Sequence, residues 1–224
     1  MLYLVATPIG NLQDITFRAV EILKEADEIV CESTDKAKIL LNHYQIKKTL
    51  IHLDDKNQLQ IIPQVLQKLK SGKKIALISD AGTPTLSDPG QFLVAQAIKE
   101  NIKITPVPGP SAVLTALVSS GLSTSPFIFY GFLPKSKSEK LKLFQEISTL
   151  KINKKTPTFI FFESPLRIKE TLQILNQNFP KTQLSIGREM TKVYEEFIRE
   201  NVGEVMKKLK NKKIKGEITL VLRF

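Results

Sequence analysis

The chain has 224 residues, of which 42% are hydrophobic, enough for one large or two small domains with apolar cores. Cys31 is the only cysteine and there are two histidines, which excludes an intrachain disulfide, a thiolate zinc cluster and a histidine-rich metal site. The N-terminus predicts a strand and a turn rather than a signal peptide, and no apolar run reaches the roughly 18 residues of a membrane span. We therefore expect a cytoplasmic protein that uses neither a membrane nor a metal.

The net charge of +11 is distributed unevenly along the chain. Residues 1–134 hold 13 basic and 12 acidic side chains, whereas residues 135–224 hold 20 basic and 10 acidic ones. Excess positive charge on one half indicates contact with a polyanion, because neutralising phosphates contributes to affinity. A lysine-rich composition is the alternative explanation, although it does not account for the balanced first half.

In the first half, strand-like apolar runs alternate with amphipathic helical patterns. Residues 2–6 predict a strand, Asp14 is expected to cap a helix that carries Phe17 and Leu23, and residues 28–31 predict the next strand. Further helices are expected near residues 36–44, 65–69, 90–100 and 111–120, and further strands at 49–52, 73–79 and 103–107. This alternation favours an α/β fold with a mainly parallel sheet and helices on both faces.

The pattern restarts after Gly121, so we predict two domains, residues 1–121 and residues 122–224. Strands are expected at residues 127–130, 158–162, 183–188 and 217–224, and helices near residues 139–150, 166–178 and 202–210. Residues 193–199 alternate between polar and apolar side chains, which suits an antiparallel strand.

Four loops rich in glycine, proline and small polar residues follow predicted strands in the first half: residues 6–12, 79–84, 87–90 and 107–112. Ligands of α/β sheets bind where strands end, and glycine lets the backbone approach a ligand closely. Residues 71–74 lack the spacing of a nucleotide-binding phosphate loop, and the dinucleotide fingerprint is absent. These patterns disfavour a nucleotide, and the residues alone leave open which other ligand the loops hold.

The strings Thr7-Pro8-Ile9-Gly10-Asn11-Leu12, Ser79-Asp80-Ala81-Gly82-Thr83-Pro84 and Pro108-Gly109-Pro110-Ser111-Ala112 carry a family resemblance. They resemble the tetrapyrrole methylase superfamily and, within it, the branch of the small-subunit ribosomal RNA methyltransferase I. Residues 131–134, residues 162–165 with Arg167, residues 188–192 and residues 215–217 continue the resemblance in the same order.

The resemblance implies a two-domain tetrapyrrole-methylase-like α/β fold with S-adenosylmethionine (S-adenosyl-L-methionine) in the cleft between the domains, usually in a homodimer. It implies 2′-O-methylation of the ribose of a cytidine in 16S ribosomal RNA, so the small ribosomal subunit would be the partner. It places the cofactor contacts on Pro8, Asp80, Ala81, Gly82, Thr83, Ser111, Ala112, Gly131, Phe132, Met190 and Gly216.

This chain departs from the family pattern mainly on loops that we expect to face the substrate. The family usually has Glu-Asp-Thr-Arg where this chain has Glu32-Ser33-Thr34-Asp35, and a histidine where this chain has Leu166. Residues 52–58 also differ, and the sequence stops at its last predicted strand, before a helical extension common in the family.

A ribose hydroxyl is a poor nucleophile, so methyl transfer needs a group that takes its proton. Glu163 and Glu189 are candidate bases, together with Glu32 and Asp35, and Arg167 or Lys192 could steer phosphate or stabilise developing charge. The alternative for Glu163 with Arg167, and for Glu189 with Lys192, is a structural ion pair. Two other functions stay open: methylation of a corrin or porphyrin carbon, and non-catalytic binding of RNA or the ribosome.

Overall fold

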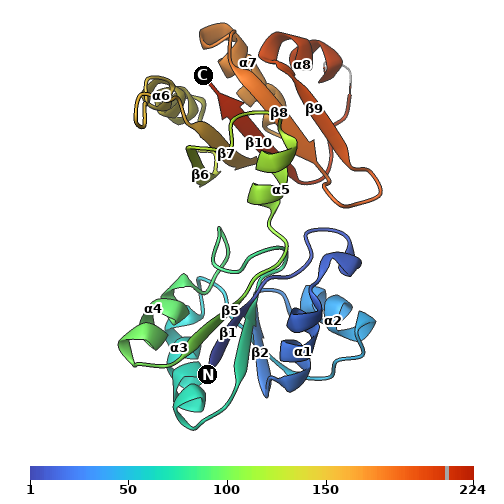
Figure 1. The fold of residues 1–224 in the computed structure, drawn as a ribbon, viewed down its shortest axis with the longest axis vertical. Helices are drawn as coiled ribbons and strands as arrows, with labels where there is room; N and C mark the ends of the chain where they lie inside the picture. The colour runs from blue at the N-terminus through green and yellow to red at the C-terminus, as the bar shows by residue number, and fades with distance from the viewer. Residues whose placement is uncertain (210–211) are drawn as a thin grey trace. The chain divides into compact units, whose positions relative to one another are not determined.

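The computed structural model describes residues 1–209 and 212–224 and divides into two compact units, Met1–Ser111 and Ala112–Phe224 (Figure 1). The division lies ten residues before the end of the first predicted domain at residue 121. The reason is helix α5 (Ala112–Ser119), which packs on strands β7 (Thr158–Glu163), β8 (Gln183–Arg188) and β10 (Ile218–Arg223) of the second unit.

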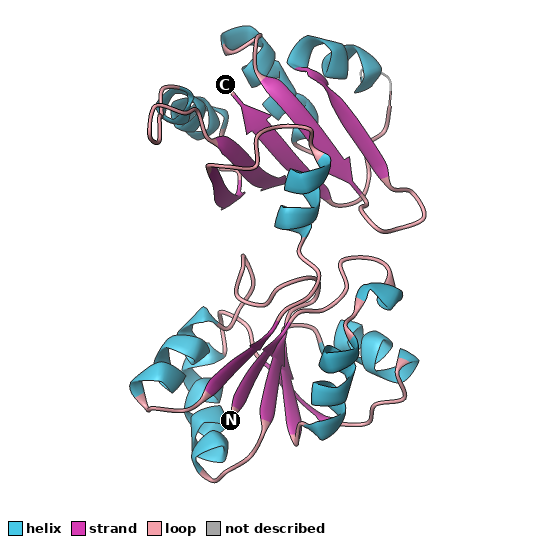
Figure 2. Ribbon diagram, in the orientation of Figure 1, coloured by secondary structure: helices cyan, strands magenta, loops and turns pink. Residues whose placement is uncertain are grey.

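The first unit is a five-stranded sheet in the order β3-β2-β4-β1-β5, and all its neighbouring strands are parallel. Its strands are β1 (Leu2–Val5), β2 (Glu28–Cys31), β3 (Thr49–His52), β4 (Ile75–Ile78) and β5 (Ile104–Val107). Its helices are α1 (Phe17–Glu25), α2 (Thr34–His43), α3 (Gln58–Lys70) and α4 (Gln91–Lys99), with a 3-10 turn at Leu12–Asp14. Figure 2 shows helices on both sides of this sheet, as the sequence predicts.

Two separate apolar clusters cover the two faces of the first sheet. One joins α1 and α2 to the sheet through residues such as Leu23 and Leu41, and the other joins α3 and α4 through residues such as Val65 and Leu93. All four residues of β4 are buried, because a parallel strand covered on both faces needs apolar side chains in both directions.

The start of α1 differs from the sequence-based prediction. Thr16, not Asp14, is the N-cap: its hydroxyl accepts a hydrogen bond from the Ala19 N–H at 3.1 Å. Asp14 instead ends the preceding 3-10 turn, so its carboxylate is one short turn too early to cap the helix.

The second unit is a mixed sheet in the order β6-β7-β10-β8-β9. It adds β6 (Phe127–Phe132), β9 (Glu196–Asn201) and helices α6 (Lys137–Ser148), α7 (Ile168–Asn178) and α8 (Val202–Leu209). β6 is parallel to β7, whereas β10 is antiparallel to β7 and β8, and β9 is antiparallel to β8. The predicted strand at residues 193–199 is therefore shifted, because residues 193–195 belong to the turn, and the predicted helix end at residue 210 lies outside the described residues.

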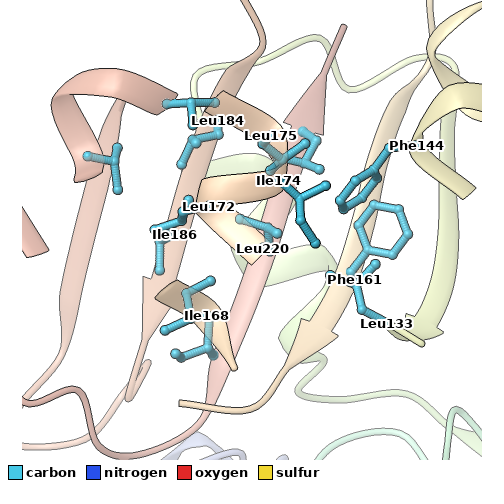
Figure 3. Close-up of a cluster of buried hydrophobic side chains, with 14 of the residues drawn as sticks. Leu133, Phe144, Phe161, Ile168, Leu172, Ile174, Leu175, Leu184, Ile186 and Leu220 are labelled. Atoms are coloured by element: carbon cyan, nitrogen blue, oxygen red, sulfur yellow. The ribbon is translucent and has the colours of Figure 1, made fainter. Parts of the chain in front are cut away.

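One large cluster of apolar side chains joins α6, α7 and α8 to the second sheet (Figure 3). Phe161 and Leu220 point into this cluster, while Ile160 and Val221, which face the opposite side by strand alternation, are buried as well. Helix α5 is absent from the cluster although it packs on the same strands, so it covers that opposite face.

No helix among the described residues is long and apolar enough to cross a membrane. Within residues 1–209 and 212–224, no cluster of three or more His, Cys, Asp or Glu side chains could hold a metal ion.

Candidate functional site

The glycine- and proline-rich loops of the first unit follow β1, β4 and β5, which are neighbours in the sheet. The strands are parallel, so their carboxyl ends lie at one edge and bring the loops together there. Thr7 and Gly82 exchange two backbone hydrogen bonds, of 2.8 and 3.0 Å, which join the loop after β1 to the loop after β4. The hydroxyls of Thr7 and Ser79 donate to the Ser79 and Gly82 carbonyls at 3.1 and 3.0 Å and fix the same turn.

The third loop, after β5, packs against this pair. The Thr83 hydroxyl donates to the Pro110 carbonyl at 3.2 Å. Gly82 has φ +83°, and a Cβ there would approach Ile9 Cγ2 to 3.3 Å and the Pro110 carbonyl oxygen to 3.7 Å. A larger side chain at Gly82 would therefore strain the backbone and push the three loops apart.

These loops carry two acidic residues, Asp80 and Asp88, and no lysine or arginine. Asp80 forms an ion pair with Lys36 at 2.9 Å and accepts the Ser33 N–H at 3.0 Å. Burial, followed by the nearby charges of Glu32 and Asp80, raises the pKa of Asp88 to about 7. Burial and Asp80 also raise the pKa of Glu32. This edge of the sheet therefore favours a positively charged ligand and holds a carboxyl group that can exchange a proton near neutral pH.

Asp88 is not among the catalytic residues that the sequence predicts, since its affinity for protons depends on burial and on acids far away in the sequence. Its only signal is its position in the loop at residues 87–90. Asp35, one of the predicted bases, is instead exposed in the first turn of α2 and lies 3.4 Å from Lys38.

In the second unit, Glu163 is fully enclosed, and both of its carboxylate oxygens have partners. Oε1 lies 2.7 Å from the Arg167 guanidinium and accepts the Ser164 N–H at 2.7 Å, while Oε2 accepts the Thr171 hydroxyl at 2.7 Å and lies 3.4 Å from the Lys140 ammonium. A carboxylate with this many donors is stabilised in its charged form and has no free lone pair directed to solvent. The geometry favours the structural alternative for Glu163.

Arg167 links this buried carboxylate to the loop that follows β6. Its guanidinium donates to the carbonyls of Pro134 and Leu133 at 3.2 and 3.4 Å. It therefore positions the backbone next to Gly131 and Phe132, two of the predicted cofactor contacts, rather than standing free to meet a phosphate.

Glu189 is similarly held in place by its neighbours. Its Oε1 accepts the Glu217 N–H at 2.9 Å and lies 2.9 Å from the Lys192 ammonium, and these contacts lower the pKa of Glu189. Burial opposes charge on Lys192, but its hydrogen bonds to Glu189 and Glu217 raise its pKa. Gly216, at φ +90°, passes directly over the Glu189 side chain and leaves no room for a Cβ.

Met190 is buried beside Gly187, where a Cβ would approach the Met190 sulfur to 2.7 Å. Phe132 ends β6 and is 62% exposed, with its ring edge-on to Phe162. Because β6, β7 and β8 run in the same direction, Phe132, Glu163 and Met190 all lie near one edge of the second sheet.

The predicted site residues thus form two groups, each at a strand-end edge of its own unit. Pro8, Asp80, Ala81, Gly82, Thr83 and Ser111 belong to the first unit, and Ala112, Gly131, Phe132, Glu163, Arg167, Met190, Glu189, Lys192 and Gly216 belong to the second. A single cleft that contains both groups stays a prediction.

Residues 1–206 match the sequence model of the tetrapyrrole (corrin/porphyrin) methylases. Among curated relatives, the ribosomal RNA small subunit methyltransferase I of Halalkalibacterium halodurans is 45% identical over 99% of this chain and 75% of its own length. The proteins of the same name from Hydrogenobaculum sp. and Thermotoga maritima are 44% and 43% identical, over 99% of this chain and 94% and 97% of their own lengths.

Solved structures agree on the fold. A diphthine synthase superposes with a TM-score of 0.73 at 15% identity, covering 99% of this chain and 89% of its own. The cobalamin biosynthetic enzyme cobalt precorrin-4 methyltransferase superposes with a TM-score of 0.67 at 16% identity, covering 99% and 93%. The chain therefore belongs to the tetrapyrrole methylase family and, within it, to the family of the ribosomal RNA small subunit methyltransferase I.

Proposed function

We propose that the protein transfers a methyl group from S-adenosylmethionine to the ribose 2′-hydroxyl of a cytidine in 16S ribosomal RNA. The observation that carries the proposal is identity of 43–45% to ribosomal RNA small subunit methyltransferase I proteins over 99% of the chain. The excess of basic residues in positions 135–224 supports an RNA substrate over a tetrapyrrole. The homodimer and the cytoplasmic location stay predictions.

The residues at the first edge fit this cofactor. S-adenosylmethionine supplies an activated methyl group on a sulfonium, and it carries positive but no phosphate charge. Loops with Asp80 and Asp88 and without lysine or arginine favour such a ligand and disfavour a nucleoside triphosphate. Pro8, Asp80, Ala81, Gly82, Thr83 and Ser111 would hold it from the first unit, and Ala112, Gly131, Phe132, Met190 and Gly216 from the second.

The chain's own part in the reaction is to orient the ribose and to accept the proton of its 2′-hydroxyl. Asp88 suits the second task better than Glu163 or Glu189. Its pKa is raised to about 7, whereas the pKa of Glu189 is lowered and both oxygens of Glu163 are occupied. Arg167 and Lys192 then act as positioning residues for the loops of the second unit.

Calorimetry with S-adenosylmethionine, without added metal, tests the cofactor assignment. We expect a single class of site, weakened by Asp80→Ala and by Gly82→Val. Gly72→Val is the matched control, since Gly72 also has a positive φ but a Cβ at this position would have no neighbouring atom within 4 Å. No binding to the wild type, or equal binding by wild type and both site variants, would refute the assignment.

Transfer of a labelled methyl group to isolated small ribosomal subunits, followed by mapping of ribose methylation, tests the reaction. One methylated cytidine is the expected result. Binding of cofactor and subunits without transfer would favour the non-catalytic alternative, and transfer to a corrin or porphyrin would favour the other.

A further inference from the structure

The turn between β8 and β9 presents two side chains that no packing within its unit explains. Val193 is 94% exposed and Tyr194 is 73% exposed, and Figure 1 shows their segment as a loop extending beyond the ends of both strands. Within the part of the chain that the structure describes, no aromatic ring packs against Tyr194. An aromatic side chain held in water contributes little to folding, so its position calls for a partner.

The loop that carries these side chains is nevertheless tightly ordered. The Thr191 N–H donates to the Glu195 carboxylate at 2.7 Å, the Lys192 N–H to the Glu189 carbonyl at 3.0 Å, and the Glu195 N–H to the Lys192 carbonyl at 3.1 Å. The Lys192 ammonium then joins Glu189 to Glu217, at 2.9 Å from each. Such a loop loses little conformational entropy when a partner binds to its tip.

The charge of the surrounding chain indicates the class of that partner. Residues 135–224 carry 20 basic against 10 acidic side chains, a composition suited to phosphate rather than to a basic or neutral protein surface. Unpaired RNA bases are commonly bound by stacking on exposed tyrosine or phenylalanine rings beside cationic residues. Tyr194 with Lys192 two residues earlier matches this combination.

We infer that Tyr194 is a stacking platform for an unpaired nucleobase of the RNA substrate, held in position by the Glu189–Lys192–Glu217 ion-pair network. The inference rests on the proposed function and names the contact that would bind a base rather than a phosphate. Val193 lies next to it at the tip of the loop and would shield one side of the stacked base from water.

The chain has no tryptophan, so Tyr194→Trp introduces a single fluorophore at this position. An unstructured oligocytidylate should quench its emission, because a stacked base contacts the indole directly. Inorganic polyphosphate carries the charge without the bases and should leave the emission unchanged. Phe17→Trp is the matched control: Phe17 is 92% exposed but lies in the first unit, and no quenching is expected there.

Affinity measurements on variants without tryptophan give a second readout. Tyr194→Ala should weaken oligocytidylate binding about five- to hundredfold, the range typical of one stacked base, while Tyr194→Phe should bind like the wild type. Loss of affinity in Tyr194→Phe as well would point to the hydroxyl group and refute stacking.

Three results of the fluorescence experiment would overturn the inference: equal quenching in both tryptophan variants, quenching by polyphosphate, or no quenching by oligocytidylate. An emission change that follows protein concentration without RNA would assign the loop to a second copy of the chain instead. Failure of the inference is separable from failure of the proposed function, because methyl transfer to small subunits by the wild type is measured independently.

Discussion

The carboxylates at the two strand-end edges experience opposite electrostatic environments. In the first unit, Glu32, Asp80 and Asp88 act on one another, and the result is a raised pKa for Glu32 and Asp88. In the second unit, Glu163 and Glu189 are paired with cations and backbone N–H groups. The same residue type is therefore available for proton transfer at one edge and fixed as a structural anion at the other.

The largest expected effect comes from removing a charge at the second edge. Glu163→Gln should lower the free energy of unfolding by about 3 kcal/mol or more, since it leaves the fully buried Lys140 with only Glu170 as a charged partner. Denaturant unfolding measures the change, and Glu146→Gln on the exposed face of α6 is the control. Unchanged stability with a large loss of turnover would show that Glu163 is a base after all and would break the comparison.

Gly216→Ala is expected to have the next largest effect. A left-handed φ costs alanine about 1–2 kcal/mol, and the collision with the Glu189 side chain should add about 1–3 kcal/mol. Gly72→Ala separates the two contributions, because Gly72 has φ +94° and open space around a Cβ. Equal unfolding free energies for the two variants would mean that the Glu189 network adjusts freely and does not anchor this edge.

The smallest of the three effects concerns Asp88 and depends on pH. A carboxyl whose folded pKa is about 7 stabilises the fold fully below its unfolded pKa near 4, and this contribution is lost as the pH rises through 7. Asp88→Asn should therefore stabilise the protein above pH 7 by about 1 kcal/mol, a figure reduced because the carboxyl is partly exposed and screened. Unfolding at pH 5 and pH 8 measures it.

If Asp88 is also the base, the acid limb of the pH–rate profile for kcat should have a midpoint near 7, and Asp88→Asn should abolish turnover while cofactor binding persists. A stability change that does not depend on pH would contradict the raised pKa.

Much of the first unit was predictable from the sequence because local patterns decide it. The apolar run of β4 and the turn-rich loops after it follow from strand burial and from glycine and proline, and the family strings predict the two-domain fold that the superposed structures share. The pattern fails where contacts distant in sequence decide. Lys140 lies in a lysine-rich helix that the sequence suggests is solvated, yet its ammonium is buried between Glu163 and Glu170.

The site was predictable only as a set of loops, and the roles within it were not. Whether a carboxylate is a base or a buried anion depends on partners such as Thr171 and Lys140, which no spacing reveals. The strand predicted for residues 193–199 failed for a similar reason, since the contacts between Glu189, Lys192 and Glu217 hold the start of that segment in a turn.

The absence of a side chain at Gly187 also has a chemical consequence for Met190. The thioether occupies the space that a Cβ at position 187 would take, and it is 7% exposed. Methionine becomes a polar sulfoxide when peroxide reaches its sulfur, and a sulfoxide would not fit in this apolar recess. Met1 and Met206, the other two methionines, are only partly buried and would be oxidised first. A glycine in the middle of β8 thus gives Met190, a proposed cofactor contact, resistance to oxidative damage.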